Sequence, residues 1–202
     1  NISPSGLDFG NILSESQLGV MVSNDGTDTL NISAMALPNG FSGSLADSTL
    51  APGEAAELTV SITPEDNGYW TGDVLLTSDS YLQSEHSVAL SALSMNTLLV
   101  HDYGGVLTSL SSDTTFTFNN TGNTDLVLDS LRTGQEAFTT DVVDGTTLSS
   151  GGSQSIVVTF APTTSDTVEG AVVLHTALGS IAFGTLAGDG WNWPEAQFAA
   201  KS

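Results

Sequence analysis

Two eight-residue stretches, ELTVSITP at 57–64 and SIVVTFAP at 155–162, decide the fold of this 202-residue chain. Each alternates polar and apolar side chains, a period of two that is typical of a β-strand with one buried face. The alternation predicts that Leu58, Val60 and Ile62 lie on one face of the first strand. The second stretch is expected to bury its apolar residues in the same way.

The two stretches belong to a longer repeat. NDGTDTLNIS at 24–33 returns 96 residues later within NNTGNTDLVLDS at 119–130, and Pro64 returns as Pro162 at an offset of 98. Turn signals rich in Gly, Pro and Asn separate the strand patterns, and helical periodicity is absent. Two copies of about 95 residues with some seven short strands each predict an all-β chain of two tandem immunoglobulin-like β-sandwich domains.

The repeat also predicts the domain boundaries. The first sandwich is expected at 1–95 and the second at 96–190. The stretch WNWPEAQFAAKS at 191–202 lies outside the repeat and forms an aromatic C-terminal tail.

Each copy resembles the Hydin-type immunoglobulin-like module, the ASH domain, and its relatives in bacterial choice-of-anchor D surface proteins. The resemblance rests on the opening LDFGNI at 7–12, the Asn-Gly turns, the stretches LAPGEAAELTVSITP at 50–64 and LSSGGSQSIVVTFAP at 148–162, and closings such as LSALS at 90–94. It implies a structural or interaction module and carries no catalytic motif. We expect the domains to join near residues 94–97 and the segment LLVHDYGG at 98–105 to lie between them.

The charge balance excludes two classes of partner. The chain has 23 acidic residues against two basic ones, Arg132 and Lys201, for a net charge of −21. Nucleic acids and anionic membrane surfaces are bound chiefly through Lys and Arg, so neither is expected as a partner. No apolar run of about eighteen residues is present, so membrane insertion is not expected either.

Composition also suggests a location. The chain has no cysteine, which excludes disulfides and thiolate metal sites. Ser, Thr, Gly, Asn and Asp fill most polar positions, which favours a secreted or cell-surface bacterial protein in a salty environment where self-repulsion is screened. Compositional drift is the alternative explanation.

The repeated Asn-Gly phrase allows two interpretations. As a calcium loop it would need about five oxygen ligands at fixed spacing and a bidentate Glu at position twelve. Only Asn and Gly are shared between the copies, since Asp25 is replaced by Thr121. Gly tolerates positive φ and Asn hydrogen-bonds nearby backbone, so the phrase predicts a tight turn. Weak, opportunistic binding of divalent cations stays open, and no cofactor is expected.

Catalytic patterns are lacking. Ser42 in GFSGSL lacks the second Gly of a nucleophile elbow and a following helix. The histidines, His86, His101 and His175, lie in or beside strand patterns or in the expected connection. We therefore expect no enzyme activity from this chain.

Five aromatic residues are the candidates for contact with a partner, namely Tyr69, Trp70, Trp191, Trp193 and Phe198. Exposed aromatic side chains can anchor a protein partner or stack on sugar rings. Packing into the core or rim is the alternative for the first two, and folding back onto the second sandwich is the alternative for the tail.

The sequence thus predicts a non-catalytic structural or adhesive module of a secreted or cell-surface bacterial protein: a spacer, adhesin segment or filament subunit. The alternative is an accessory β-sandwich pair of a secreted hydrolase that binds carbohydrate or protein. Contact with a protein partner or self-association fits either function.

Added salt should stabilise the fold, because screening weakens repulsion among the 23 acids. We expect the melting temperature to rise between low salt and about 0.5 M NaCl, measured by circular dichroism. A melting temperature that stays flat over this range would contradict the expectation.

Overall fold

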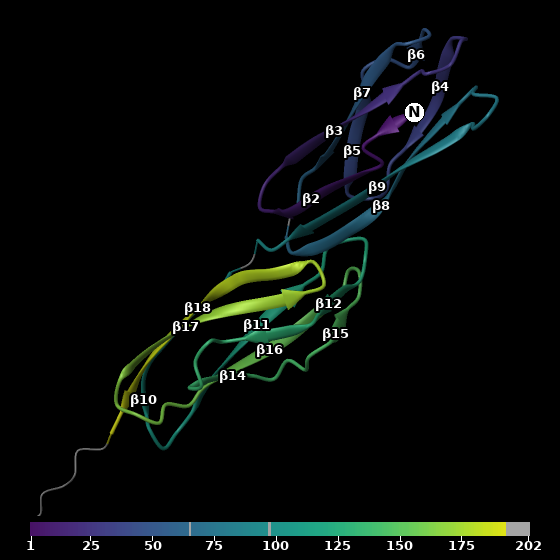
Figure 1. Ribbon diagram of the computed structural model, residues 1–202. Helices are drawn as coiled ribbons and strands as arrows, with labels where there is room; N and C mark the ends of the chain where they lie inside the picture. The colour runs from purple at the N-terminus through teal and green to yellow at the C-terminus, as the bar shows by residue number, and fades with distance from the viewer. Residues whose placement is uncertain (65, 97, 193–202) are drawn as a thin grey trace, which may run out of the picture. The chain divides into compact units, whose positions relative to one another are not determined.

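The computed structural model describes residues 1–64, 66–96 and 98–192, and Figure 1 shows that these residues form strands and turns. They include no helix, and hence none that could cross a membrane. The all-β prediction is confirmed. The strands are β1 (Ile2–Ser3), β2 (Gly6–Ile12), β3 (Ser16–Ser23), β4 (Leu30–Ala36), β5 (Phe41–Leu45), β6 (Thr49–Leu50), β7 (Ala55–Ile62), β8 (Gly68–Ser78), β9 (Glu85–Ser94), β10 (Leu99–Leu107), β11 (Ser112–Asn119), β12 (Leu126–Leu128), β13 (Ser130–Arg132), β14 (Phe138–Thr140), β15 (Thr146–Leu148), β16 (Ser153–Phe160), β17 (Thr167–Thr176) and β18 (Gly179–Trp191).

The chain divides into two compact units. Unit 1 comprises Asn1–Asn96 together with two short segments, Asn119–Leu126 and Thr147–Ser153. Unit 2 comprises residues 98–118, Val127–Thr146 and 154–192 of the described chain. Two loops of the second sequence repeat thus belong to the first compact unit.

Unit 1 is built around two sheets, with the strand orders β1-β3-β7-β5 and β2-β9-β8-β4-β6. Neighbouring strands run antiparallel except for β2, which pairs parallel with β9. Side chains from both sheets fill the space between them, as expected for a sandwich.

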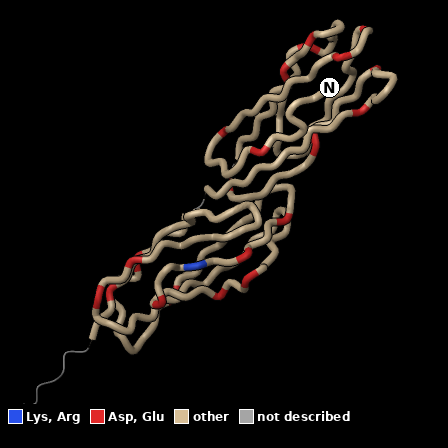
Figure 2. The backbone as a smooth tube through the Cα atoms, viewed as in Figure 1, with Lys and Arg blue, Asp and Glu red and all other residues tan. Residues whose placement is uncertain are grey.

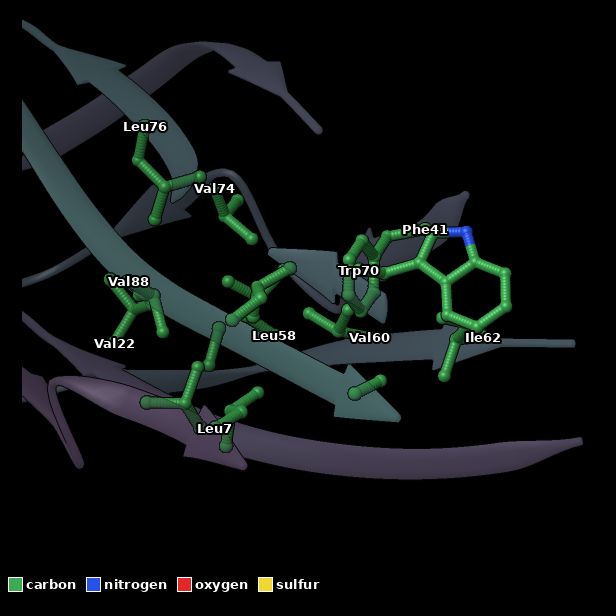
Figure 3. Close-up of a cluster of buried hydrophobic side chains, with 14 of the residues drawn as sticks. Leu7, Val22, Phe41, Leu58, Val60, Ile62, Trp70, Val74, Leu76 and Val88 are labelled. Atoms are coloured by element: carbon green, nitrogen blue, oxygen red, sulfur yellow. The ribbon is translucent and has the colours of Figure 1, made fainter. Parts of the chain in front are cut away.

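The core of unit 1 is mainly aliphatic. Leu58, Val60 and Ile62 of β7 are each at most 1% exposed, which confirms the face predicted from the alternation. In Figure 3 the ring of Trp70 lies beside Phe41 at one end of this cluster. Burial of such side chains contributes about 1.5–3 kcal/mol each.

Unit 2 has the sheet orders β10-β18-β17-β13 and β11-β16-β14, and its core combines aliphatic side chains with several aromatic rings. The ring centroids of Tyr103 on β10 and Phe160 on β16 lie 5.5 Å apart. Those of Phe118 on β11 and Phe183 on β18 lie 5.2 Å apart. Both pairs join strands of different sheets, so aromatic rings span the space between the two sheets of unit 2.

Strand register shows that the last two long strands of each repeat correspond. Tyr69 of β8 pairs with Leu93 of β9, and Thr167 of β17 pairs with Asp189 of β18. These residues are related by the sequence offsets of 98 and 96 that the repeat predicts.

Figure 2 marks the positions of acidic and basic residues along the backbone, and many of the Asp and Glu residues lie at turns and strand ends. The basic residue drawn there is Arg132, which forms an ion pair with Asp144 at 2.6 Å. Placement at turns keeps the carboxylates in water, where repulsion between like charges is weakest.

Truncation of a buried side chain should lower the free energy of unfolding more than truncation of an exposed one. Leu58→Ala is expected to lower the free energy of unfolding by about 2–5 kcal/mol, because a cavity is left between the sheets. Leu75→Ala is the matched control, since Leu75 is 50% exposed, and it should cost less than about 1 kcal/mol. Urea unfolding of both variants gives the comparison, and equal losses would contradict the assigned core.

Candidate functional site

The first Asn-Gly turn is organised around the side chain of Asn24, which is 5% exposed. Its Nδ2 donates to the carbonyl oxygens of Asp28 and Leu50, both at 2.8 Å. Its Oδ1 accepts a hydrogen bond from Gly26 N at 3.0 Å. One side chain therefore closes its own turn and ties that turn to the β6 segment.

The second turn repeats this arrangement around Asn120, which is fully buried. Its Nδ2 donates to the carbonyl oxygens of Thr124 at 2.9 Å and Leu148 at 3.0 Å. Its Oδ1 accepts from Gly122 N at 3.1 Å. The partners occupy corresponding positions of the repeat.

The backbone bonds of the two asparagines also correspond. Asn24 N donates to Glu54 O, and Asn120 N donates to Gly152 O, both at 2.9 Å. The turn interpretation is confirmed, because the amide groups of both side chains are committed to backbone partners. Among the residues the structure describes, no group of three or more His, Cys, Asp or Glu side chains could hold a metal ion.

A second duplicated feature escaped the sequence analysis. Asp8 Oδ1 accepts from Gly10 N at 2.9 Å, and Asp102 Oδ1 accepts from Gly104 N at 2.8 Å. Both glycines have positive φ, +65° and +61°, at a bulge in the parallel pairing of the first long strand of each repeat. The shared signal is an Asp-aromatic-Gly triplet, which is short and follows a different offset from the rest of the repeat.

The structure corrects the expectation for LLVHDYGG at 98–105. From Leu99 onward, the segment that we placed between the domains lies in β10, which pairs with β18. His101 is half-buried in this strand, and its Nε2 lies 2.7 Å from Thr114 Oγ1. Its edge also faces the rings of Tyr103 and Phe116, so it is a packed strand residue.

The start of β8 is covered by the loop Asn119–Leu126 of unit 1. Tyr69 N donates to Asn120 Oδ1 at 3.2 Å, and Thr124 N donates to Tyr69 O at 3.1 Å. β4 pairs with β8 only between Leu75 and Ser78, so the loop satisfies backbone groups of β8 that β4 does not reach.

Asn123 extends the same contact by two residues. Its Oδ1 accepts from Thr71 N at 2.9 Å, and its Nδ2 donates to Thr71 O at 3.0 Å. A Cβ at Gly122 would overlap the backbone of Tyr69, so glycine permits the close approach. No local sequence pattern indicates this role, because it connects residues about fifty positions apart.

The predicted aromatic contact residues differ in their surroundings. Trp70 is 6% exposed and contributes to the core of unit 1, whereas Tyr69 is half-buried. Trp191 is 60% exposed and is the last residue of β18, paired with Leu107. Trp193 and Phe198 lie outside the described residues.

An exposed pair that the sequence analysis did not single out lies between β8 and β9. Tyr81 is fully exposed and Leu82 is 93% exposed. The corresponding turn between β17 and β18 contains Leu178, which is 49% exposed.

The residues considered for catalysis lie on separate strands. Ser42 is in β5, and His86 and His175 are in β9 and β17. His175 Nδ1 lies 2.6 Å from Ser180 Oγ. The Ser42 environment is a strand and not the strand-to-helix turn of a nucleophile elbow.

Two carboxyl groups have altered acidity. Hydrogen bonds from the Asn31 side chain and Asn31 N lower the pKa of Asp79. The hydrogen bonds from Arg132 lower the pKa of Asp144 and raise that of the guanidinium. In unit 2, burial raises the pKa of the Tyr103 hydroxyl, which donates to Val158 O at 2.6 Å. Each of these groups serves a strand or turn.

Comparison with known proteins identifies one family. The family model described as HYDIN/CFA65/VesB-like, Ig-like domain matches residues 1–92 and 96–189. No curated protein matches the chain.

Several solved structures are similar. One is a protein of unknown function from Porphyromonas gingivalis W83, with 19% identity over 94% of this chain and 98% of that chain, at a TM-score of 0.42. The Vibrio cholerae VesB protease shows 18% identity over 44% of this chain and 29% of its own, at a TM-score of 0.37. The seventh ASH/PapD-like domain of human CEP192 shows 18% identity over 47% and 82%, at a TM-score of 0.37.

Removal of either central asparagine should destabilise the fold. Asn24→Ala removes the side-chain donor to the carbonyls of Asp28 and Leu50, so we expect a loss of about 1–3 kcal/mol in the free energy of unfolding. Asn120→Ala should cost at least as much, because Asn120 also accepts from Tyr69 N. Urea unfolding measures both, with Asp25→Ala as an exposed control in the same turn. Losses no larger than that of the control would refute the structural role.

Asp79 should contribute stability only where it is ionised. Its pKa is lowered in the folded state from an ordinary value of 3.8, so its contribution is present above that pH and disappears as pH falls through the folded pKa. The difference in melting temperature between the wild type and Asp79→Ala should therefore shrink between about pH 5 and pH 2. Glu15→Ala, which removes another exposed acid, controls for net charge. A difference that does not change with pH would contradict this assignment.

Proposed function

Because the chain belongs to the HYDIN/CFA65/VesB-like family of immunoglobulin-like domains, we propose that it is a non-catalytic structural or adhesive module of a secreted or cell-surface bacterial protein. Within that protein it serves as a spacer, adhesin segment or filament subunit. We further propose domain boundaries at 1–95 and 96–190.

The observation that carries the proposal is the use of polar side chains. The two buried asparagines make corresponding sets of hydrogen bonds to backbone groups in both repeats. Asp8 and Asp102 do the same at the bulges. In an enzyme, such polar side chains would take part in catalysis. In this chain they fix turns and strands, which suits a module with a structural role.

The acidic, cysteine-free composition supports the location. A net charge of −21 is tolerated best where salt screens it. The residues proposed for contact with a protein partner are Tyr69 and Trp191, together with Trp193 and Phe198 from the sequence. Weak association of divalent cations with the exposed carboxylates fits the same surface.

A second candidate is an accessory module of a secreted hydrolase. It is favoured by the family description, which names VesB, a protein whose solved structure is that of a protease. In that case the chain would bind substrate or another protein on behalf of a catalytic domain.

Antibodies raised against this chain should detect it in the culture medium or on intact cells of the bacterium that produces it, where added protease removes it. Mass spectrometry of the detected polypeptide then separates the two candidates. A polypeptide without a hydrolase domain supports the structural module, and one with such a domain supports the accessory module. Recovery only from the cytosol, protected from protease, would refute both.

A further inference from the structure

An asparagine stands directly before a glycine at two positions of unit 1, Asn39-Gly40 and Asn67-Gly68. Such a pair can react with itself, because a glycine has no Cβ to shield the preceding side chain from attack by the glycine N. The reaction needs an accessible side-chain amide on the asparagine and a main-chain N–H that is not held in a hydrogen bond. The two pairs differ in both requirements.

Asn39 and Gly40 are exposed in the turn between β4 and β5. Phe41 N donates to Pro38 O at 3.2 Å, and Gly40 has a φ of +93°, so these residues form a β-turn with glycine at its third position. In the part of the chain that the structure describes, no hydrogen bond engages the Asn39 side-chain amide or Gly40 N. Both reacting groups are therefore accessible.

Asn67 and Gly68 are buried where β8 begins. The main-chain N–H and C=O of Tyr69 bind the loop Asn119–Leu126. Main-chain groups alternate in direction along a strand, so the N–H of Gly68 faces β9, where Gly68 pairs with Ser94. Attack by Gly68 N would break a strand hydrogen bond in a buried place, so folding protects this pair.

We propose that Asn39 is a site of spontaneous deamidation in the folded protein. Gly40 N loses its proton to base in the solvent and attacks Cγ of Asn39, and ammonia leaves as a cyclic succinimide forms. Water then opens either carbonyl of this ring, which yields aspartate or isoaspartate. The net change consumes one water and releases one ammonia, so no enzyme, oxidant or cofactor is required. The inference rests on the geometry of unit 1 and not on the proposed function.

The two products affect the turn differently. Aspartate keeps the ordinary main chain and adds a negative charge, whereas isoaspartate routes the main chain through the former side chain and lengthens it by a methylene. Asn39 O accepts from Asn123 Nδ2 at 2.9 Å. Gly40 lies so close to Trp70 that a Cβ there would come within 2.5 Å of the ring atom Cδ1. A longer main chain displaces these contacts, so isoaspartate should loosen the turn and lower the stability of unit 1.

The test follows deamidation in the full chain. The protein is kept in mildly alkaline buffer, folded or unfolded in urea, and is then digested after glutamate, since it has only two basic residues. Mass spectrometry of the peptides measures conversion at each asparagine and separates aspartate from isoaspartate. In the folded protein Asn39 should convert at least about tenfold faster than Asn67, because reaction at Asn67 requires local opening of β8. In urea the two pairs should convert at similar rates.

Two variants serve as controls. Asn39→Gln should stay unmodified at this position, because its longer side chain closes a larger and less favoured ring. Asn39→Asp carries the charge of the product on an ordinary main chain, so its melting temperature should stay close to that of fresh wild type. Aged wild type enriched in isoaspartate should melt at a lower temperature than either.

The proposal would be overturned by folded protein in which Asn39 does not convert, or in which Asn67 converts equally fast. Slow conversion of Asn67 in urea would overturn the assigned cause, because its protection would then not depend on the fold. An isoaspartate-rich sample that melts like Asn39→Asp would overturn the effect assigned to the longer main chain.

Discussion

In each repeat, the hydrogen bonds of a single buried asparagine side chain fix the loops that connect the strands. The side chain of Asn24 donates to two carbonyl groups, one in its own turn and one in a neighbouring segment. The side chain of Asn120 does the same in the second repeat. Backbone carbonyls that are removed from water need hydrogen-bond donors. An asparagine side chain offers two N–H groups and one acceptor in a plane, so it satisfies both carbonyls and closes its own turn. The positions of β4 and β6, and hence the edges of the sheets, follow from this constraint.

Much of the fold could be predicted from the sequence because its signals are local. Alternation in β7 and β16 identified the buried faces, and Asn-Gly identified the turns. The Asp-aromatic-Gly bulge was missed because its offset differs from that of the surrounding repeat. LLVHDYGG was therefore placed between the domains, although most of it lies in β10. The loop on β8 was missed for another reason: its bonds join Tyr69 and Thr71 to residues about fifty positions away, and no local pattern records such a contact.

The candidate contact residues illustrate the same limit. Tyr69 and Trp70 are adjacent in sequence, and the sequence left both partner contact and packing into the core or rim open for each of them. In the strand their side chains alternate, so Trp70 enters the core while Tyr69 stays half-buried. Tyr81 and Leu82 are far more exposed, but an isolated apolar pair in a polar turn gives no periodic signal. Exposure depends on the facing sheet, which a single strand pattern does not specify.

The different cores of the two units have a consequence for folding. Neighbouring domains with similar sequences tend to exchange strands and misassemble while both are partly folded. Both cores pack Leu, Val and Ile, but individual positions differ in volume, since Val22 corresponds to Phe118 and Ile62 corresponds to Phe160. A strand from one repeat would bring side chains of the wrong volume into the other, leaving voids or overlaps that disfavour the mixed product. Divergence of the cores thus protects a duplicated chain from pairing with its own copy.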